Sequence, residues 1–255
     1  MFEGKDLKTL EYEIILECNY RCPYCTNGRN DLLKNKIPES FDIEKLKVIF
    51  SSFDFIYIYG GEPLLSPKIL NVLDILQNKD HVIQTNFSKP EIIEKIIKKY
   101  PKTKFWVSAH NSQIKDKGSF KQLLLKYKNN IDELNVMFYD YKDIKFYVFL
   151  KDVCKNIQLT PIAGFGAKTK AQEKRLNGSL IKYNKLRSLK IKHINFDNGC
   201  NRSFNWEKQI KDPMKGKQCP CIGGYFQLDP ALNLHHCPLR YDGEICPFNM
   251  CFNYD

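Results

Sequence analysis

Residues 12–162 alternate between short β-rich apolar runs and segments with apolar residues at helical spacing. The expected strands are YEIILE (12–17), FIYIYG (55–60), HVIQTN (81–86), KFWVSA (104–109), LNVMFY (134–139) and IQLTPI (157–162). The expected helices are 42–52, 67–78, 89–100 and 119–130, whereas 141–153 fits either a helix or a strand. Repeated strand–helix units predict parallel strands with right-handed crossovers, and therefore an α/β fold that is an open doubly wound sheet or a partial barrel.

Polar residues and glycines follow five of these expected strands. They are Cys18 after the first, Gly60-Gly61-Glu62 after the second, Thr85-Asn86 at the end of the third, Ser108 and His110 at the end of the fourth, and Gly164-Phe165-Gly166 after the sixth. The carboxyl ends of parallel strands meet at one rim, where α/β folds bind their ligands. We therefore expect these residues to converge on one functional site.

The composition indicates a soluble chain with reduced thiols. Hydrophobic residues make up 43% of the 255 residues, yet no apolar run approaches the roughly 20 residues needed to cross a bilayer. The first residues, MFEGKDLKTLEYE, are too charged for a signal peptide, so we expect a cytoplasmic protein without a membrane partner. Cytoplasmic thiols are kept reduced, so the ten cysteines are expected to be ligands or catalysts rather than disulfides.

Three cysteines, Cys18, Cys22 and Cys25, lie in the stretch ILECNYRCPYCTNG (15–28), directly after the first expected strand. A disulfide takes two thiols and a closed zinc site usually takes four ligands. Three thiolates can instead hold three irons of a cubane iron–sulfur cluster and leave the fourth iron open to a small molecule. A zinc site with a distant fourth ligand is the alternative.

Two motifs in the right order resemble the radical S-adenosylmethionine (radical SAM) enzymes. The first is C-x-x-x-C-x-x-C, here Cys18, Cys22 and Cys25, with the aromatic Tyr24 before the last cysteine. The second is YGGEPLL (59–65), which looks like the family's Gly-Gly-Glu-Pro motif. The resemblance covers residues 12 to about 166 and implies a partial (β/α)6 TIM-like barrel, which we assign to residues 1–192.

The resemblance also implies roles for residues at the rim. The open iron of a [4Fe–4S] cluster would bind the amino and carboxylate groups of S-adenosylmethionine, with Gly60, Gly61 and Glu62 at the amino group. Tyr24 would lie beside the adenine, and the loop 160–166 would support it. Ser108 would bond the ribose, with Asn86 or His110 as options. An external electron donor such as flavodoxin or ferredoxin would start the reaction, and no further catalytic residue is assigned.

Residues 193–255 lose the helical periodicity and carry the second group of cysteines. A short hairpin is expected at 224–229 and 233–237, with its turn at 230–232. The region resembles the SPASM or twitch auxiliary-cluster extension, although Asn233 replaces the usual turn glycine. The resemblance implies a second [4Fe–4S] cluster on Cys221, Cys237, Cys246 and Cys251, with Cys219 as an alternative ligand and Cys200 as a ligand if a third cluster exists. Structural zinc would suit the same thiols, and Cys154 reads as an ordinary buried thiol.

The leading functional hypothesis is a radical SAM oxidoreductase. It would cleave S-adenosylmethionine to a 5′-deoxyadenosyl radical, abstract a substrate hydrogen and use the auxiliary cluster as electron acceptor. The substrate would be a peptide or protein side chain, or a sugar- or cyclitol-type small molecule. An RNA-modifying enzyme is supported only by the net charge of +11, and the spread of the lysines disfavours a nucleic-acid partner. A non-enzymatic zinc-binding module is the remaining alternative.

Overall fold

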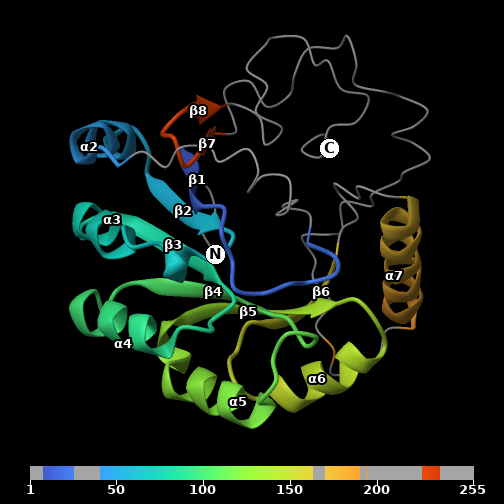
Figure 1. Ribbon diagram of the computed structural model, residues 1–255. Coiled ribbons are helices and arrows are strands. Elements are labelled where there is room, and N and C mark those ends of the chain that lie inside the picture. The colour runs from blue at the N-terminus through green and yellow to red at the C-terminus, as the bar shows by residue number, and fades with distance from the viewer. Residues whose placement is uncertain (1–7, 26–40, 163–169, 190–193, 195–225, 236–255) are drawn as a thin grey trace.

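The computed structural model describes residues 8–25, 41–162, 170–189, 194 and 226–235, and its strands form one eight-stranded sheet (Figure 1). The strand order is β6-β5-β4-β3-β2-β1-β7-β8. Every neighbouring pair is parallel except β7 and β8. The strands are β1 (Thr9–Ile15), β2 (Phe55–Gly60), β3 (Asp80–Thr85), β4 (Lys104–Ala109), β5 (Ile131–Phe138), β6 (Ile157–Pro161), β7 (Phe226–Leu228) and β8 (Leu234–His235).

The first six strands confirm the six predicted from the sequence, and differences occur at their ends. The strand β1 begins at Thr9 rather than at residue 12, because residues 9–11 already pair with Phe55–Tyr57. The pairing of β1 with β2 is irregular between Glu13 and Ile15, and Ile15 lies opposite Gly60 of β2. The strand β5 similarly begins earlier, at Ile131, which pairs with Phe105.

The sequential strand order decides between the two architectures that the sequence allowed. A doubly wound sheet reverses its strand order at a switch point, whereas β1 to β6 follow one another across this sheet without a reversal. Figure 1 accordingly shows the helices between these strands on one side of the sheet. The doubly wound alternative is therefore wrong, while closure into a partial barrel stays a prediction.

The helices confirm the four predicted segments, settle the ambiguous one and add one, Lys170–Ser188, that was not predicted from the sequence. They are α2 (Ile43–Ser51), α3 (Ile69–Ile75), α4 (Pro90–Lys99), α5 (Lys117–Lys126), α6 (Lys142–Leu150) and α7 (Lys170–Ser188), with short 3-10 turns at Pro63–Leu65 and Lys128–Asn130. Residues 141–153, which fitted either state, contain α6. The helix α5 starts two residues early because the Asp116 carboxylate accepts a 3.0 Å bond from the Ser119 N–H and caps it.

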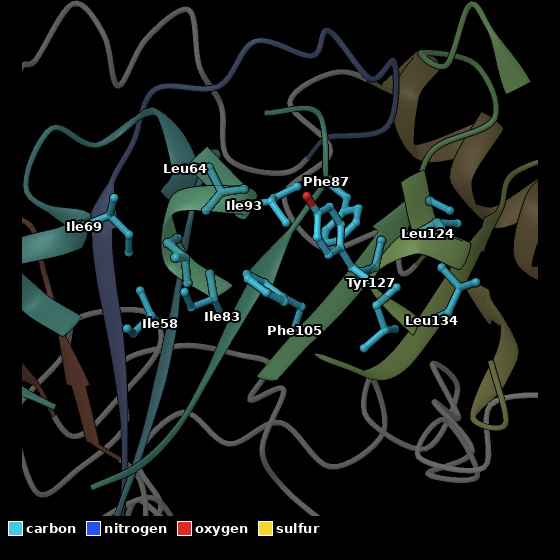
Figure 2. Packing of buried hydrophobic residues seen from close by; sticks show 14 of the residues in the cluster. Ile58, Leu64, Ile69, Ile83, Phe87, Ile93, Phe105, Leu124, Tyr127 and Leu134 are labelled. Carbon is cyan, nitrogen blue, oxygen red and sulfur yellow. The ribbon is translucent and has the colours of Figure 1, made fainter. Parts of the chain in front are cut away.

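The hydrophobic core lies between the strands and these helices. Alternate strand residues such as Ile58, Phe105 and Leu134 are fully buried on the helix side. Figure 2 shows them packed against residues from the helices and loops, including Ile93 and Leu124. This core fixes the strand ends, and with them the loops that carry the candidate site. None of the described helices is long and apolar enough to cross a membrane.

The predicted hairpin forms, but it belongs to the same sheet. The strands β7 and β8 pair antiparallel, with Gln227 opposite His235. The strand β7 also pairs in parallel with β1, with Leu10 opposite Phe226 and Tyr12 opposite Leu228. This pairing was not predicted, and it places a segment of the region 193–255 inside the core sheet.

Candidate functional site

The carboxyl ends of the strands surround one pocket of about 390 Å³. Most of the predicted site residues line it, namely Cys18, Cys22, Tyr24, Cys25, Gly60, Gly61, Asn86, Ser108 and His110. They come from the loop after β1 and from the ends of β2, β3 and β4. The expected convergence of strand-end residues on one rim is therefore found in the structure.

Gly60 and Gly61 join the end of β2 to the chain that leaves β1. Gly60 has a φ of +148°, which side chains rarely adopt, and a Cβ atom there would lie 2.2 Å from the Ile15 carbonyl oxygen. The Gly61 N–H donates a 2.7 Å bond to that same oxygen, and the Glu62 N–H donates a 2.8 Å bond to the Glu17 oxygen. The two glycines therefore allow the backbone after β2 to lie close to the backbone after β1. This contact fixes the position at which the cysteine loop begins.

The Glu62 side chain is fully buried and does not line the described pocket. Its carboxylate accepts hydrogen bonds from the Thr85 hydroxyl at 2.7 Å, the Asn86 N–H at 2.7 Å and the Leu64 N–H at 3.0 Å. Burial raises the pKa of Glu62, and these three bonds oppose the shift. In the structure, Glu62 ties the β2 loop to the end of β3.

The Cys18 thiol is buried and receives two N–H donors. The Tyr20 backbone N–H lies 3.4 Å from Cys18 Sγ, and Asn86 Nδ2 lies 3.7 Å from it. The carbonyl oxygen of Cys18 accepts a 2.7 Å bond from the Arg21 guanidinium. This part of the loop is thus held by its own neighbours and by β3.

Two aromatic rings that line the pocket, those of Tyr24 and His110, stack on each other, and the Tyr139 ring lies tilted beside Tyr24. The Tyr24 and His110 rings are stacked with centroids 5.8 Å apart, and the Tyr24 hydroxyl lies 3.0 Å from His110 Nδ1. The Tyr139 ring lies 5.1 Å from that of Tyr24. Burial is the main cause that raises the pKa of Tyr24, so its hydroxyl stays protonated. The stack presents a flat apolar wall of the kind that planar ligands pack against.

The three cysteines of the pocket are compatible with an iron–sulfur cluster. Within the described part of the chain, no three His, Cys, Asp or Glu side chains are arranged to hold one metal ion. A cubane does not require such an arrangement, because each thiolate binds a different iron. Three cysteines that line one pocket without meeting at a point are compatible with three corners of a cluster.

Sequence reasoning missed several residues of the pocket. Tyr20, Tyr59, Gln84 and Met137 also line it, in addition to Thr85, Pro161 and Ile162, which belong to the strand end and the loop expected there. Most of them lie at or near strand ends, so the strand prediction was a signal that could have identified them. Burial, helped by the charge of Glu62, raises the pKa of Tyr20 to about 12.

Other predicted site residues lie outside the described residues. They are the loop residues 163–166 and the cysteines Cys200, Cys219, Cys221, Cys237, Cys246 and Cys251. Cys154 lies away from the pocket, beside Asp132 and Asn156. Burial raises the pKa of its thiol to about 11, although the residue is half-buried rather than buried as predicted.

Comparison with known proteins supports the resemblance to radical SAM enzymes. The sequence is 31% identical over 108 residues to a Methanocaldococcus jannaschii protein that carries the name of a glycyl-radical enzyme activating enzyme. That match covers 36% of this chain and 42% of the relative. No family model matches the sequence.

The fold is similar to that of SuiB from Streptococcus suis. For SuiB bound to S-adenosylmethionine, the TM-score is 0.58 at 15% identity, over 95% of this chain and 63% of SuiB. For SuiB bound to the precursor peptide SuiA, the TM-score is 0.57 at 14% identity, over 95% and 62% of the two chains. The match therefore spans less than two thirds of the length of SuiB and less than half of the Methanocaldococcus jannaschii relative. The sequence match agrees with the resemblance noted in the sequence, and the structural match shows a shared fold.

Proposed function

We propose that this chain is a radical SAM enzyme whose Cys18, Cys22 and Cys25 hold a [4Fe–4S] cluster with one open iron. When bound, that cluster would supply the electron that cleaves S-adenosylmethionine to methionine and a 5′-deoxyadenosyl radical, which abstracts a hydrogen atom from the substrate. One observation carries the proposal. The three cysteines and the polar ends of three strands line the same pocket.

The chain's own residues would bind and orient the cofactor. Gly60 and Gly61 line the pocket and would meet the amino group, while the buried Glu62 would hold their loop in place. The aromatic face of Tyr24 would pack beside the adenine.

Ser108 is the best candidate for a ribose contact. Its hydroxyl oxygen accepts a 3.2 Å bond from Gln84 Nε2, and among the described contacts its hydroxyl hydrogen has no acceptor. A serine hydroxyl has one donor and two acceptor positions. Ser108 could therefore donate a hydrogen bond to a ribose oxygen. The Nδ1 of His110 bonds the Tyr24 hydroxyl, so a contact from His110 to the ribose would use its Nε2.

The substrate is proposed to be a polypeptide side chain, with a sugar- or cyclitol-type molecule as the second class. The Methanocaldococcus jannaschii relative is named as an activating enzyme for another enzyme, and SuiB was solved with a precursor peptide. Those names make peptides the first class to assay. The matches cover less than two thirds of each relative, so peptide modification by this chain is a proposal.

An auxiliary cluster is the second part of the proposal. Cys221, Cys237, Cys246 and Cys251 would be its ligands, with Cys219 as the alternative, in a region assigned to 193–255. Four thiolates would leave no open iron, so that cluster would accept an electron rather than bind substrate. Cys237→Ala should lower the iron content from about eight to about four per chain if both sites are cubanes. About four irons and one zinc in the wild type would instead indicate a structural zinc site.

The central experiment measures 5′-deoxyadenosine formed from S-adenosylmethionine by the anaerobically reconstituted protein with dithionite. The wild type should form it, and Cys22→Ala should not. Cys154→Ala is the matched control, because that thiol lies outside the pocket. Normal cleavage by Cys22→Ala, or a wild type that binds zinc and no iron, would contradict the proposal. Turnover of an RNA probe in place of peptides would favour the RNA-modifying alternative.

A further inference from the structure

The side-chain amide of Asn86 connects the end of β3 to the first cysteine. Asn86 is 5% exposed, and its Nδ2 lies 3.0 Å from Asn19 Oδ1 and 3.7 Å from Cys18 Sγ. Its Oδ1 accepts a 3.1 Å bond from the Ser88 N–H, and the Ser88 hydroxyl in turn accepts a 2.8 Å bond from Asn19 Nδ2. An amide nitrogen has two hydrogens, so these contacts use both.

The backbone around Asn86 holds this amide in one orientation. The Asn86 N–H donates to the buried carboxylate of Glu62, and the Thr85 hydroxyl donates to the same carboxylate. The next residue, Phe87, has a φ of +58° and a fully buried ring that packs on Phe105. A bulky residue in this left-handed conformation persists only where the surroundings fix it. The amide is therefore presented to Cys18 by rigid neighbours.

These contacts point away from the role that sequence reasoning gave Asn86. Both donors of Asn86 are directed to Cys18 and Asn19, so a ribose contact would depend on its Oδ1, which already accepts a bond from the Ser88 N–H. The sulfur of Cys18 also receives the Tyr20 N–H at 3.4 Å. Cys18 is thus a buried sulfur with one backbone donor and one side-chain donor.

We propose that Asn86 sets the reduction potential of the cluster through its N–H···S hydrogen bond to Cys18. This inference rests on the proposed function, since it requires a cluster on Cys18. Reduction adds one electron, from an external one-electron donor, and no bond is formed or broken. The added charge falls partly on the sulfur ligands, so an N–H donor stabilises the reduced state more than the oxidised state. Asn86 therefore raises the reduction potential, and it acts as a positioning residue rather than a catalytic residue.

The first test measures the midpoint potential of the reconstituted cluster by EPR at stepped potentials. Asn86→Ala removes the donor, and Asn86→Asp replaces it with an acceptor oxygen and a negative charge at nearly the same shape. The potential should fall from wild type to Asn86→Ala and further to Asn86→Asp. Asn129→Asp makes the same change on an exposed residue far from the pocket and should keep the wild-type potential. A wild-type potential in iron-loaded Asn86→Ala and Asn86→Asp would overturn the inference.

The second test begins with the wild type, so its first result does not depend on a variant that could fail to load the cluster. Wild-type protein is prepared with ¹⁵N in its asparagine side chains, and the reduced cluster is studied by pulsed EPR. A ¹⁵N coupling should be present and should persist in Asn19→Ala, which leaves Asn86 as its source. A loaded wild type without such a coupling, or loss of the coupling in loaded Asn19→Ala alone, would overturn the inference. A wild type that assembles no cluster would refute the proposed function instead, so the two failures are distinguishable.

Discussion

A Cβ atom on Gly61 would lie 2.1 Å from the carbonyl oxygen of Glu17, the residue directly before Cys18. The same imagined atom would lie 2.5 Å from the Leu16 oxygen. The second glycine of the Gly-Gly-Glu-Pro motif is therefore needed for backbone packing against the start of the cysteine loop. A motif expected to serve the cofactor also builds the loop that would hold the cluster.

Gly61→Ala should displace the cysteine loop. An overlap with backbone cannot be relieved by rotating a side chain, so we expect a loss of about 2 kcal/mol or more in the free energy of unfolding. Iron content after reconstitution should fall with it. Gly178→Ala, in α7, is the control: no atom lies within 4 Å of its added Cβ, and alanine favours helix by about 1 kcal/mol. Equal iron content and stability in the two variants would contradict this explanation.

Two substitutions of Tyr24 distinguish the contribution of its ring to stability and binding from the contribution of its hydroxyl. Tyr24→Phe removes the 3.0 Å contact with His110 Nδ1 and should cost about 1 kcal/mol of stability while keeping the stack. Tyr24→Ala removes the wall itself and should cost about 3 kcal/mol or more. If the ring packs beside the adenine, calorimetry should show a loss of affinity for S-adenosylmethionine of about tenfold, or 1.4 kcal/mol, in Tyr24→Ala. Equal losses of affinity in both variants would instead assign the effect to the hydroxyl.

His81 should make stability depend on pH outside the candidate site. Its Nδ1 bonds the Lys79 carbonyl at 2.8 Å and its Nε2 meets the Thr103 hydroxyl at 3.0 Å, and burial lowers the pKa of the imidazole below 6.5. At a pH between the lowered pKa of His81 in the folded state and its ordinary pKa in the unfolded state, the unfolded chain binds more protons than the folded chain. The free energy of unfolding therefore falls as the pH decreases through about 6.5.

The measurement is urea unfolding of the wild type and His81→Gln between about pH 7.5 and pH 5, a range chosen around the ordinary histidine pKa. His81→Gln should be less stable than the wild type at neutral pH and should lose less stability on acidification. Parallel pH profiles of the two proteins would show that His81 does not titrate in this range.

The sequence predicted the elements whose pattern is local. In β2 and β4, buried and more exposed residues alternate because each strand buries one face. Ile56 and Phe105 lie on the buried face, as the sequence pattern predicts. The α6 segment was ambiguous because its aromatic and β-branched residues suit both periods. The pairing of β7 with β1 could not be predicted from the sequence of a three-residue strand. It depends on which strand, far away in the sequence, forms an unpaired edge of the sheet.

The site was predictable where a motif fixes the chemistry, and less so where it depends on side-chain direction. The cysteine spacing indicated the thiol loop, and the strand ends indicated Ser108 and Asn86. Nothing in the sequence indicated that Glu62 turns into the core or that the Asn86 amide points at Cys18. Those directions are set by contacts between loops that lie far apart in the chain.

The β7–β8 hairpin offers a direct test of whether this segment belongs to the core sheet. Leu228, in β7, is fully buried and pairs with Tyr12 of β1, whereas Leu234, in β8, is 41% exposed. Leu228→Ala should therefore cost about 2 to 4 kcal/mol, because it removes buried apolar area and leaves a cavity beside β1. Leu234→Ala makes the same chemical change on the same hairpin and should cost less than about 1 kcal/mol. The free energy of unfolding of the full chain in urea, monitored by tryptophan fluorescence, compares the two. If Leu228→Ala were as mild as Leu234→Ala and left the core transition unchanged, the hairpin would unfold separately and the pairing of β7 with β1 would contribute nothing to the stability of the sheet.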